Sequence, residues 1–175
     1  FTAQVTLFSG DYGPQHADGV ETVVVGDDGL VARRGVDDVS WTREDPGTDK
    51  HLWAVSGVSS GDLWAVGGGS SILRYIDGAW TVASSGGSVS LRSVWVPEDG
   101  DVDGVMASGS GGLIYKRVGG QWVTEQVAGG ETILHGIWGA GESRFVVGTA
   151  VNDQITLSGK EDASSPWDGH NANVN

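Results

Sequence analysis

Tryptophans and glycines recur in this sequence with a shared period of about 42 residues, and this period constrains the fold more than any other feature. One tryptophan series has steps of 39, 42 and 45 residues, and a second has steps of 42 and 43. A glycine that closes an apolar run recurs with steps of 41, 42 and 39. The three series are Trp41, Trp80, Trp122 and Trp167; Trp53, Trp95 and Trp138; and Gly26, Gly67, Gly109 and Gly148. One period in three registers indicates a repeat protein.

Each repeat contains four short β-rich runs that are separated by Gly, Asp and Ser. The second repeat, from His51, reads HLWAVSG, DLWAVGGG, SILRYIDG and AWTVASS. The first is more divergent and reads AQVTLFSG, VETVVVGDDG, LVARRG and VSWTRED. Four antiparallel strands per repeat are the signature of a β-propeller blade. The sequence therefore predicts an all-β propeller of about four blades, each of four antiparallel strands, which either close alone as a small propeller or form part of a larger ring.

The period divides the chain into five predicted segments. Residues 1–50 form a divergent first blade, residues 51–90 a second blade and residues 91–133 a third. Residues 134–167 form a fourth, irregular blade, and residues 168–175 form a polar tail without a strand pattern. An open arc of blades exposes apolar faces and strand edges, so we also expect self-assembly or additional blades that complete the ring.

The repeated tryptophans and glycines are interpreted as structural. The apolar second run of each repeat fits a strand that is buried on both faces. The glycine after it allows either a positive φ or a close approach of adjacent blades. A tryptophan at the start of the fourth run can cover a seam between blades. Trp64, outside both tryptophan series, is interpreted as core, with sugar stacking as the alternative.

The segment LWAVSGVSSGDLWAVGGGSSILRYIDGAW resembles bacterial propeller repeats grouped with the BNR/Asp-box and kelch-like propellers, in which xxWAVGxxGxIxxYDGxxW recurs. The resemblance covers residues 51 to about 150 and, more loosely, residues 1–50. It implies a propeller fold in a group that includes binding scaffolds, lectins, glycosidase domains and assembly factors. An intact Asp box, SxDxGxxW, is absent from the sequence, because Asp77, Gly78 and Trp80 give only a compressed version of it.

Charge and composition argue against several classes of partner and site. The net charge of −13 opposes binding to a phosphate backbone, so we expect no nucleic-acid partner. No apolar run approaches the ~18 residues of a membrane helix, so we expect no membrane partner. The absence of Cys excludes disulfides and thiolate sites. The sequence begins at Phe1, from which we expect an exported protein in an extracellular or periplasmic location.

The sharpest chemical motif is DGDVDG at residues 99–104, which matches the DxDxDG core of calcium loops. The carboxylates of Asp99, Asp101 and Asp103 can converge on one Ca²⁺ ion, to which the Val105 carbonyl adds a fourth oxygen. The bidentate Glu that ends a full EF-hand loop is absent. Because Asp and Gly also favour turns, a plain acidic turn is the alternative.

No complete catalytic constellation accompanies the repeat. The sequence has neither a GxSxG elbow nor a phosphate-binding glycine loop, and its His residues lack zinc-site spacing. We therefore predict a non-catalytic binding or scaffold module for a protein or glycan ligand, stabilised by calcium if the acidic motif binds it. One alternative is a glycoside-processing enzyme, or a fragment of one, of a sialidase-like propeller type, with acid and base drawn from carboxylates such as Asp77, Glu125 and Glu142. The other is a multivalent propeller lectin.

Overall fold

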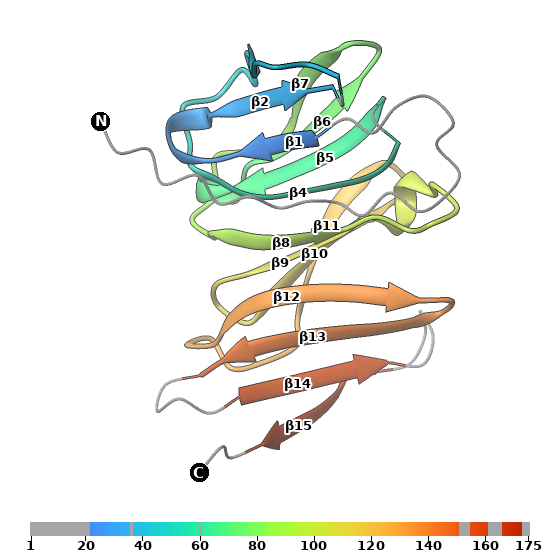
Figure 1. The fold of residues 1–175 in the computed structure, drawn as a ribbon. Helices are drawn as coiled ribbons and strands as arrows, with labels where there is room; N and C mark the ends of the chain where they lie inside the picture. Colours follow the sequence, from blue (N-terminus) through green and yellow to red (C-terminus); the bar gives the residue numbers. More distant parts are fainter. Residues whose placement is uncertain (1–21, 36, 60, 151–154, 161–165, 173–175) are drawn as a thin grey trace. The chain divides into compact units, whose positions relative to one another are not determined.

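The structure is a computed structural model that describes residues 22–35, 37–59, 61–150, 155–160 and 166–172. The chain divides into two compact units, Phe1–Ser88 and Val89–Asn175. Each unit contains two antiparallel sheets (Figure 1). Within the described ranges, no helix has the length and apolarity that a membrane span requires.

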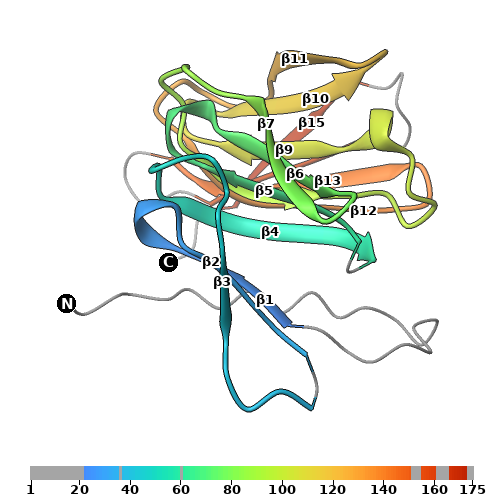
Figure 2. The ribbon, with the colours of Figure 1, turned by 90° about the horizontal axis from the view of Figure 1, so that it is seen from above.

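The first unit combines a three-stranded sheet with a four-stranded one. The first sheet has the order β1 (Thr22–Val25), β2 (Val31–Arg34) and β3 (Thr42–Glu44). The second has the order β4 (Leu52–Ser59), β5 (Asp62–Gly67), β6 (Ile72–Ile76) and β7 (Ala79–Ser84). Strands β1 and β4 are neighbours (Figure 2), so the two sheets share one apolar core. That core contains Val23, Val25, Val31, Leu52, Val55, Leu63, Ala65, Leu73 and Trp80.

The second unit combines two four-stranded sheets. One contains β8 (Leu91–Trp95), β9 (Met106–Gly109), β10 (Leu113–Val118) and β11 (Gln121–Gln126). The other contains β12 (Ile133–Ala140), β13 (Ser143–Thr149), β14 (Ile155–Lys160) and β15 (Asp168–Ala172). Strand β12 contacts β8 and β9, and the buried residues of this interface are Met106, Ile114, Leu134, Ile137 and Val146.

The prediction of an all-β chain built from four antiparallel sheets is confirmed, with two differences in detail. The predicted strand in AQVTLFSG lies outside the described residues, so the first sheet has three described strands. The prediction that residues 168–175 carry no strand needs correction, because β15 pairs with β14 from Asp168 to Ala172. Backbone amides and carbonyls supply this pairing, whatever the polarity of the side chains.

The glycines near the end of the second strand in the three four-stranded sheets are required by close approach of the chain. The φ of Gly67 is −167°, which is extended backbone open to any residue. A Cβ at Gly67 would overlap the carbonyl oxygen of His51, and a Cβ at Gly109 would overlap that of Ser90. The predicted positive φ is therefore wrong for these two glycines, and the close approach is to the first strand of the same sheet and not, as predicted, to an adjacent blade.

The tryptophans divide into buried and exposed groups. Trp64 and Trp80 are buried as predicted, and the Trp80 Nε1 donates a hydrogen bond of 2.7 Å to Glu44 Oε2. Trp41 and Trp138 are each 44% exposed, so the interpretation of every repeated tryptophan as core is wrong for these two. The guanidinium of Arg34 instead stacks on the indole of Trp41, with its carbon atom 5.2 Å from the ring centre.

Candidate functional site

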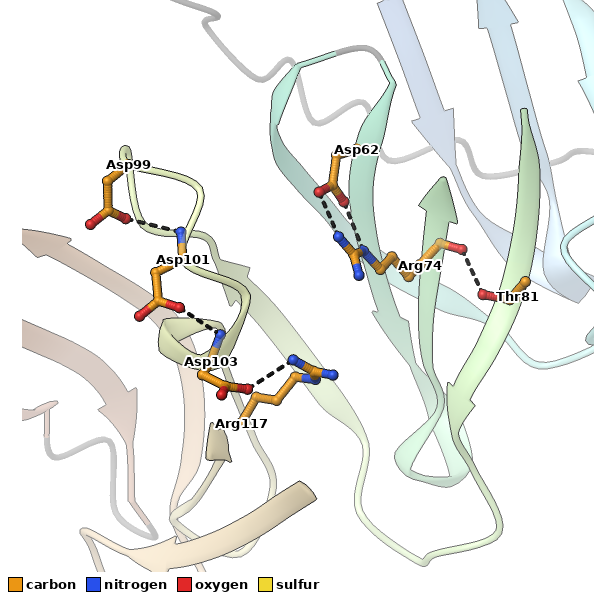
Figure 3. Close-up of polar contacts among 7 residues, drawn as sticks. All are labelled: Asp62, Arg74, Thr81, Asp99, Asp101, Asp103 and Arg117. Carbon is orange, nitrogen blue, oxygen red and sulfur yellow. Dashed lines mark hydrogen bonds and ion pairs between the residues drawn. The ribbon is translucent and has the colours of Figure 1, made fainter. Parts of the chain in front are cut away.

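The predicted calcium loop connects β8 to β9 and contains a short 3₁₀ turn, η3 (Val102–Gly104). One oxygen of Asp99 accepts a hydrogen bond of 3.0 Å from the backbone nitrogen of Asp101. In the same way, one oxygen of Asp101 accepts a hydrogen bond of 3.0 Å from the backbone nitrogen of Asp103 (Figure 3). Each of these two carboxylates therefore stabilises the turn that leads to the next aspartate.

The last aspartate of the loop is engaged by the β10–β11 hairpin. Asp103 Oδ1 accepts hydrogen bonds from Arg117 Nη1 at 2.8 Å and from the Gly120 nitrogen at 3.0 Å. The Val105 carbonyl accepts a bond of 3.0 Å from the Arg117 nitrogen. In the part of the chain that the structure describes, no group of three His, Asp or Glu residues is placed to hold a metal ion. The observed contacts are those of an acidic turn, and calcium at this loop stays a prediction.

A hollow of about 240 Å³ lies beside this loop, within the second unit. The end of β8 and the first loop residues after it form one wall, and the β12–β13 hairpin forms the other. Its lining consists of Trp95, Pro97, Glu98, Asp99, Gly139, Gly141 and Arg144, and we call it the Trp95/Arg144 pocket.

Arg144 is fixed in this pocket by an aromatic ring and two carbonyl groups. Its guanidinium carbon lies 4.1 Å from the ring centre of Trp95, within the range of a cation–π contact. Its Nη1 donates to the carbonyls of Gly141 at 2.7 Å and Ser143 at 2.8 Å. A Cβ at Gly139 would come within 2.7 Å of the Trp95 ring and 2.9 Å of the Arg144 side chain. The stack therefore depends on glycine at position 139.

Arg144 also differs in its charge environment from three other partly buried arginines. Arg33, Arg74 and Arg117 each form an ion pair with a carboxylate at 2.7 to 2.8 Å. Among the described residues, no carboxylate comes within ion-pair distance of Arg144. Burial lowers the pKa of Arg144, and the attraction of Asp99 and Glu142 opposes this only in part. Both hydrogen bonds of the Arg144 side chain come from Nη1. Its Nε and Nη2 donors have no hydrogen-bond partner in the described part of the protein.

The importance of Arg144 was not predicted from the sequence, although a signal for it exists. Counted back from the glycine that closes the second strand, Arg144 occupies the position of Leu63 in the second repeat and Val105 in the third. Both of those residues are fully buried apolar side chains. The first repeat has Thr22 at this position, so a charged residue where the other three repeats have uncharged side chains is the feature that would have marked this pocket.

The carboxylates suggested for an enzyme occupy other places. Asp77 lies in the β6–β7 turn, Glu125 on β11 and Glu142 in the β12–β13 turn. A second hollow, of about 400 Å³, lies in the first unit and is lined by Asp28, Gly29, Arg43, Glu44, Asp45, Pro46 and Thr48. Neither this hollow nor the Trp95/Arg144 pocket is lined by the three suggested carboxylates. The enzyme alternative stays a prediction without a site among these two hollows.

No family model and no curated protein matches this sequence. A solved structure described as YCF48 bound to D1 peptide is similar to the chain, with a TM-score of 0.56. The chain has a β-propeller fold. The sequences are 17% identical, and the match covers 85% of this chain and 48% of the other. The chain therefore spans about half the length of that propeller, and at this identity the similarity establishes the fold alone.

Proposed function

We propose that this protein is a non-catalytic binding module that recognises a protein segment at the Trp95/Arg144 pocket. The observation that carries the proposal is the set of contacts of Arg144, whose guanidinium is oriented by the Trp95 ring and two carbonyls while its Nε and Nη2 donors lack partners among the described residues. A donor that is already oriented loses little conformational freedom when a ligand binds. The YCF48 structure was solved with a bound peptide, which supports a protein ligand for a chain of the same fold.

The chemistry of the pocket suits a polypeptide. Arg144 offers donors, and the carboxylates of Glu98 and Asp99 line the same hollow as acceptors. A peptide backbone presents C=O and N–H groups a few ångströms apart. It can therefore accept hydrogen bonds from Arg144 and donate to the carboxylates at the same time. A carboxylate side chain on the ligand would strengthen the contact with Arg144 by forming a charge-assisted hydrogen bond. We therefore expect bound segments to pair an acidic side chain with nearby donors.

A glycan ligand receives less support from this geometry. Sugar binding in propellers with repeated pockets would require the same lining in each repeat, but Leu63 and Val105 replace Arg144 at the matching positions. In addition, Arg144 covers one face of the Trp95 ring, on which a sugar would otherwise stack. A single pocket of mixed charge favours one protein segment over several equivalent sugars.

A peptide array probed with the full chain tests the proposal. The parent should bind a subset of peptides, and Arg144→Ala should weaken binding to that subset at least tenfold, which is about 1.4 kcal/mol. Arg34→Ala is the matched control, because it removes another arginine that stacks on a tryptophan but lies outside the pocket. An array without bound peptides, or equal loss in both variants, would contradict the proposal.

Three finer predictions from the sequence remain proposals beside this one. Calcium bound by Asp99, Asp101, Asp103 and Val105 would compete with the bond between Asp103 and Arg117. A relationship to the BNR/Asp-box and kelch-like groups rests on the repeat motif, since no family model matches. An extracellular or periplasmic location stays a prediction from the sequence.

A further inference from the structure

Arg74 in the first unit shows how this protein uses an arginine that is stacked on an aromatic ring. Its guanidinium carbon lies 5.1 Å from the ring centre of Trp64. Its Nε and Nη2 donate to the two oxygens of Asp62 at 2.9 and 2.7 Å (Figure 3). The spacing of the two nitrogens matches that of the two carboxylate oxygens, which makes this contact stronger and more directional than a single hydrogen bond.

Arg33 repeats this arrangement in part, and Arg144 has the aromatic ring without the carboxylate. The guanidinium carbon of Arg33 lies 4.3 Å from the ring centre of Tyr75, and its Nε donates to Glu44 at 2.7 Å. That of Arg144 lies 4.1 Å from the ring centre of Trp95, but the hydrogen bonds of its side chain come from Nη1 alone. The Nε and Nη2 edge, to which a carboxylate binds in the first unit, therefore has no such partner among the described residues.

The surroundings of Arg144 are acidic, although none of these carboxylates forms an ion pair with it. Asp99 and Glu142 attract its guanidinium through space, and Glu98 lines the same pocket. The whole chain carries a net charge of −13. These charges would repel a ligand with several carboxylates, whereas they would attract basic side chains that flank a single carboxylate.

We infer that the Trp95/Arg144 pocket recognises one carboxylate of the bound peptide, held by both Nε and Nη2 of Arg144, in a segment whose other charges are basic. The inference rests on the proposed function and adds the chemical group that decides which peptides bind. An Asp or Glu side chain and a peptide C-terminus both supply this group, since each presents the same two oxygens. A backbone carbonyl has a single oxygen, so it would leave the two-bond contact incomplete.

A peptide array probed with the full chain over a range of concentrations tests the inference. Each sequence, anchored through its N-terminus, is present in three forms: an internal Glu with an amidated end, Gln with an amidated end, and Gln with a free C-terminal carboxylate. At least one carboxylate form should bind about tenfold more tightly than the Gln amide, and the form that does so identifies the source of the carboxylate. Lys or Arg beside the carboxylate should strengthen binding, and Asp or Glu should weaken it.

Arg144→Lys is the deciding variant, because lysine keeps the positive charge but cannot form two parallel bonds. It should lose most of the preference for the carboxylate form. Arg34→Lys is the matched control, since Arg34 also stacks on a tryptophan but lies outside the pocket, and it should keep that preference. Glu98→Gln should reduce the preference for basic neighbours, because it removes an exposed carboxylate from the pocket lining.

The array separates failure of the inference from failure of the proposed function. Peptides that depend on Arg144, as judged by Arg144→Ala, but bind equally in all three forms would overturn the inference and leave the proposed function in place. An array without bound peptides would overturn both. A carboxylate preference that survives in Arg144→Lys, or a preference for acidic neighbours, would overturn the inference alone.

Discussion

The guanidinium of Arg144 stacks on the indole of Trp95 at 4.1 Å, although 48 residues separate the two along the chain. Strand alternation places Arg144 on one face of β13 and its neighbour Phe145 on the other. The Trp95/Arg144 pocket and the exposed, stacked rings of Trp138 and Phe145 are therefore on opposite sides of the same sheet.

Gly139→Ala should weaken peptide binding while Gly130→Ala should not. An added Cβ at position 139 would push against both Trp95 and Arg144, so the guanidinium would leave its present position. Nothing lies within 4 Å of a Cβ added at Gly130, which makes it the control. Isothermal titration with an array-selected peptide checks the prediction. Equal affinities of the two variants would show that the stack is not needed for binding.

Gly109→Ala should lower the free energy of unfolding by about 1–3 kcal/mol, the usual cost of forcing extra volume into packed structure. The new methyl group would overlap the carbonyl oxygen of Ser90 on the neighbouring chain segment. The backbone there cannot move aside as easily as a flexible side chain could. Urea unfolding of the parent and the variant measures the difference. An unchanged midpoint would mean that the sheet relaxes at this point without loss.

Asp62→Asn should lower the free energy of unfolding by about 1–2 kcal/mol, because a charge-assisted pair is lost and Arg74 stays partly buried. Arg74 donates from Nε at 2.9 Å and from Nη2 at 2.7 Å to the two oxygens of Asp62 (Figure 3). The hydrogen bond with Asp62 raises the pKa of Arg74, so the arginine keeps its charge at any pH of practical interest.

Asp49→Asn is the control for this ion pair. The Asp49 side chain is 87% exposed beside Lys50, and solvent screens such a pair almost completely. Urea unfolding should show no more than ~0.5 kcal/mol of change for this variant. Similar losses in Asp49→Asn and Asp62→Asn would assign the effect to net charge and not to the bidentate bond.

Calcium, if it binds the loop as the DxDxDG motif predicts, should raise the melting temperature of the parent and not that of Asp101→Ala. Binding to the native state alone stabilises it in proportion to the logarithm of the ligand concentration. A thermal scan with added calcium or with chelator measures the shift. No shift in the parent would leave the loop as an acidic turn, held by the bonds of Asp103 to Arg117 and Gly120.

The strands and their closing glycines could be predicted from the sequence because both depend on local pattern. Alternation and β-branched runs identify a strand wherever it packs, and the Gly67 and Gly109 positions recur at the repeat period. Strand β15 was missed because its residues, DGHNA, are polar and give no such pattern. Its pairing with β14 uses the backbone, which every sequence shares.

The candidate site could not be predicted because it depends on contacts between distant residues. Trp95 and Trp138 occupy equivalent places in the repeat, yet Trp95 stacks with Arg144 and Trp138 stacks with Phe145. The difference arises from which side chain lies next to each ring in the folded protein, and the repeat period of the sequence does not specify that neighbour. Likewise, the motif predicted that Asp103 turns toward a metal, whereas its observed partner, Arg117, comes from another hairpin.

Peptide binding at Arg144 is measured most directly by the NMR signal of its Nε–H group during titration with an array-selected peptide. The signal is assigned by its loss in Arg144→Lys. This signal should move as the peptide saturates the protein, while the signal of Arg34 stays in place. A peptide that binds without moving the Arg144 signal would contradict the assignment of the Trp95/Arg144 pocket as the binding site.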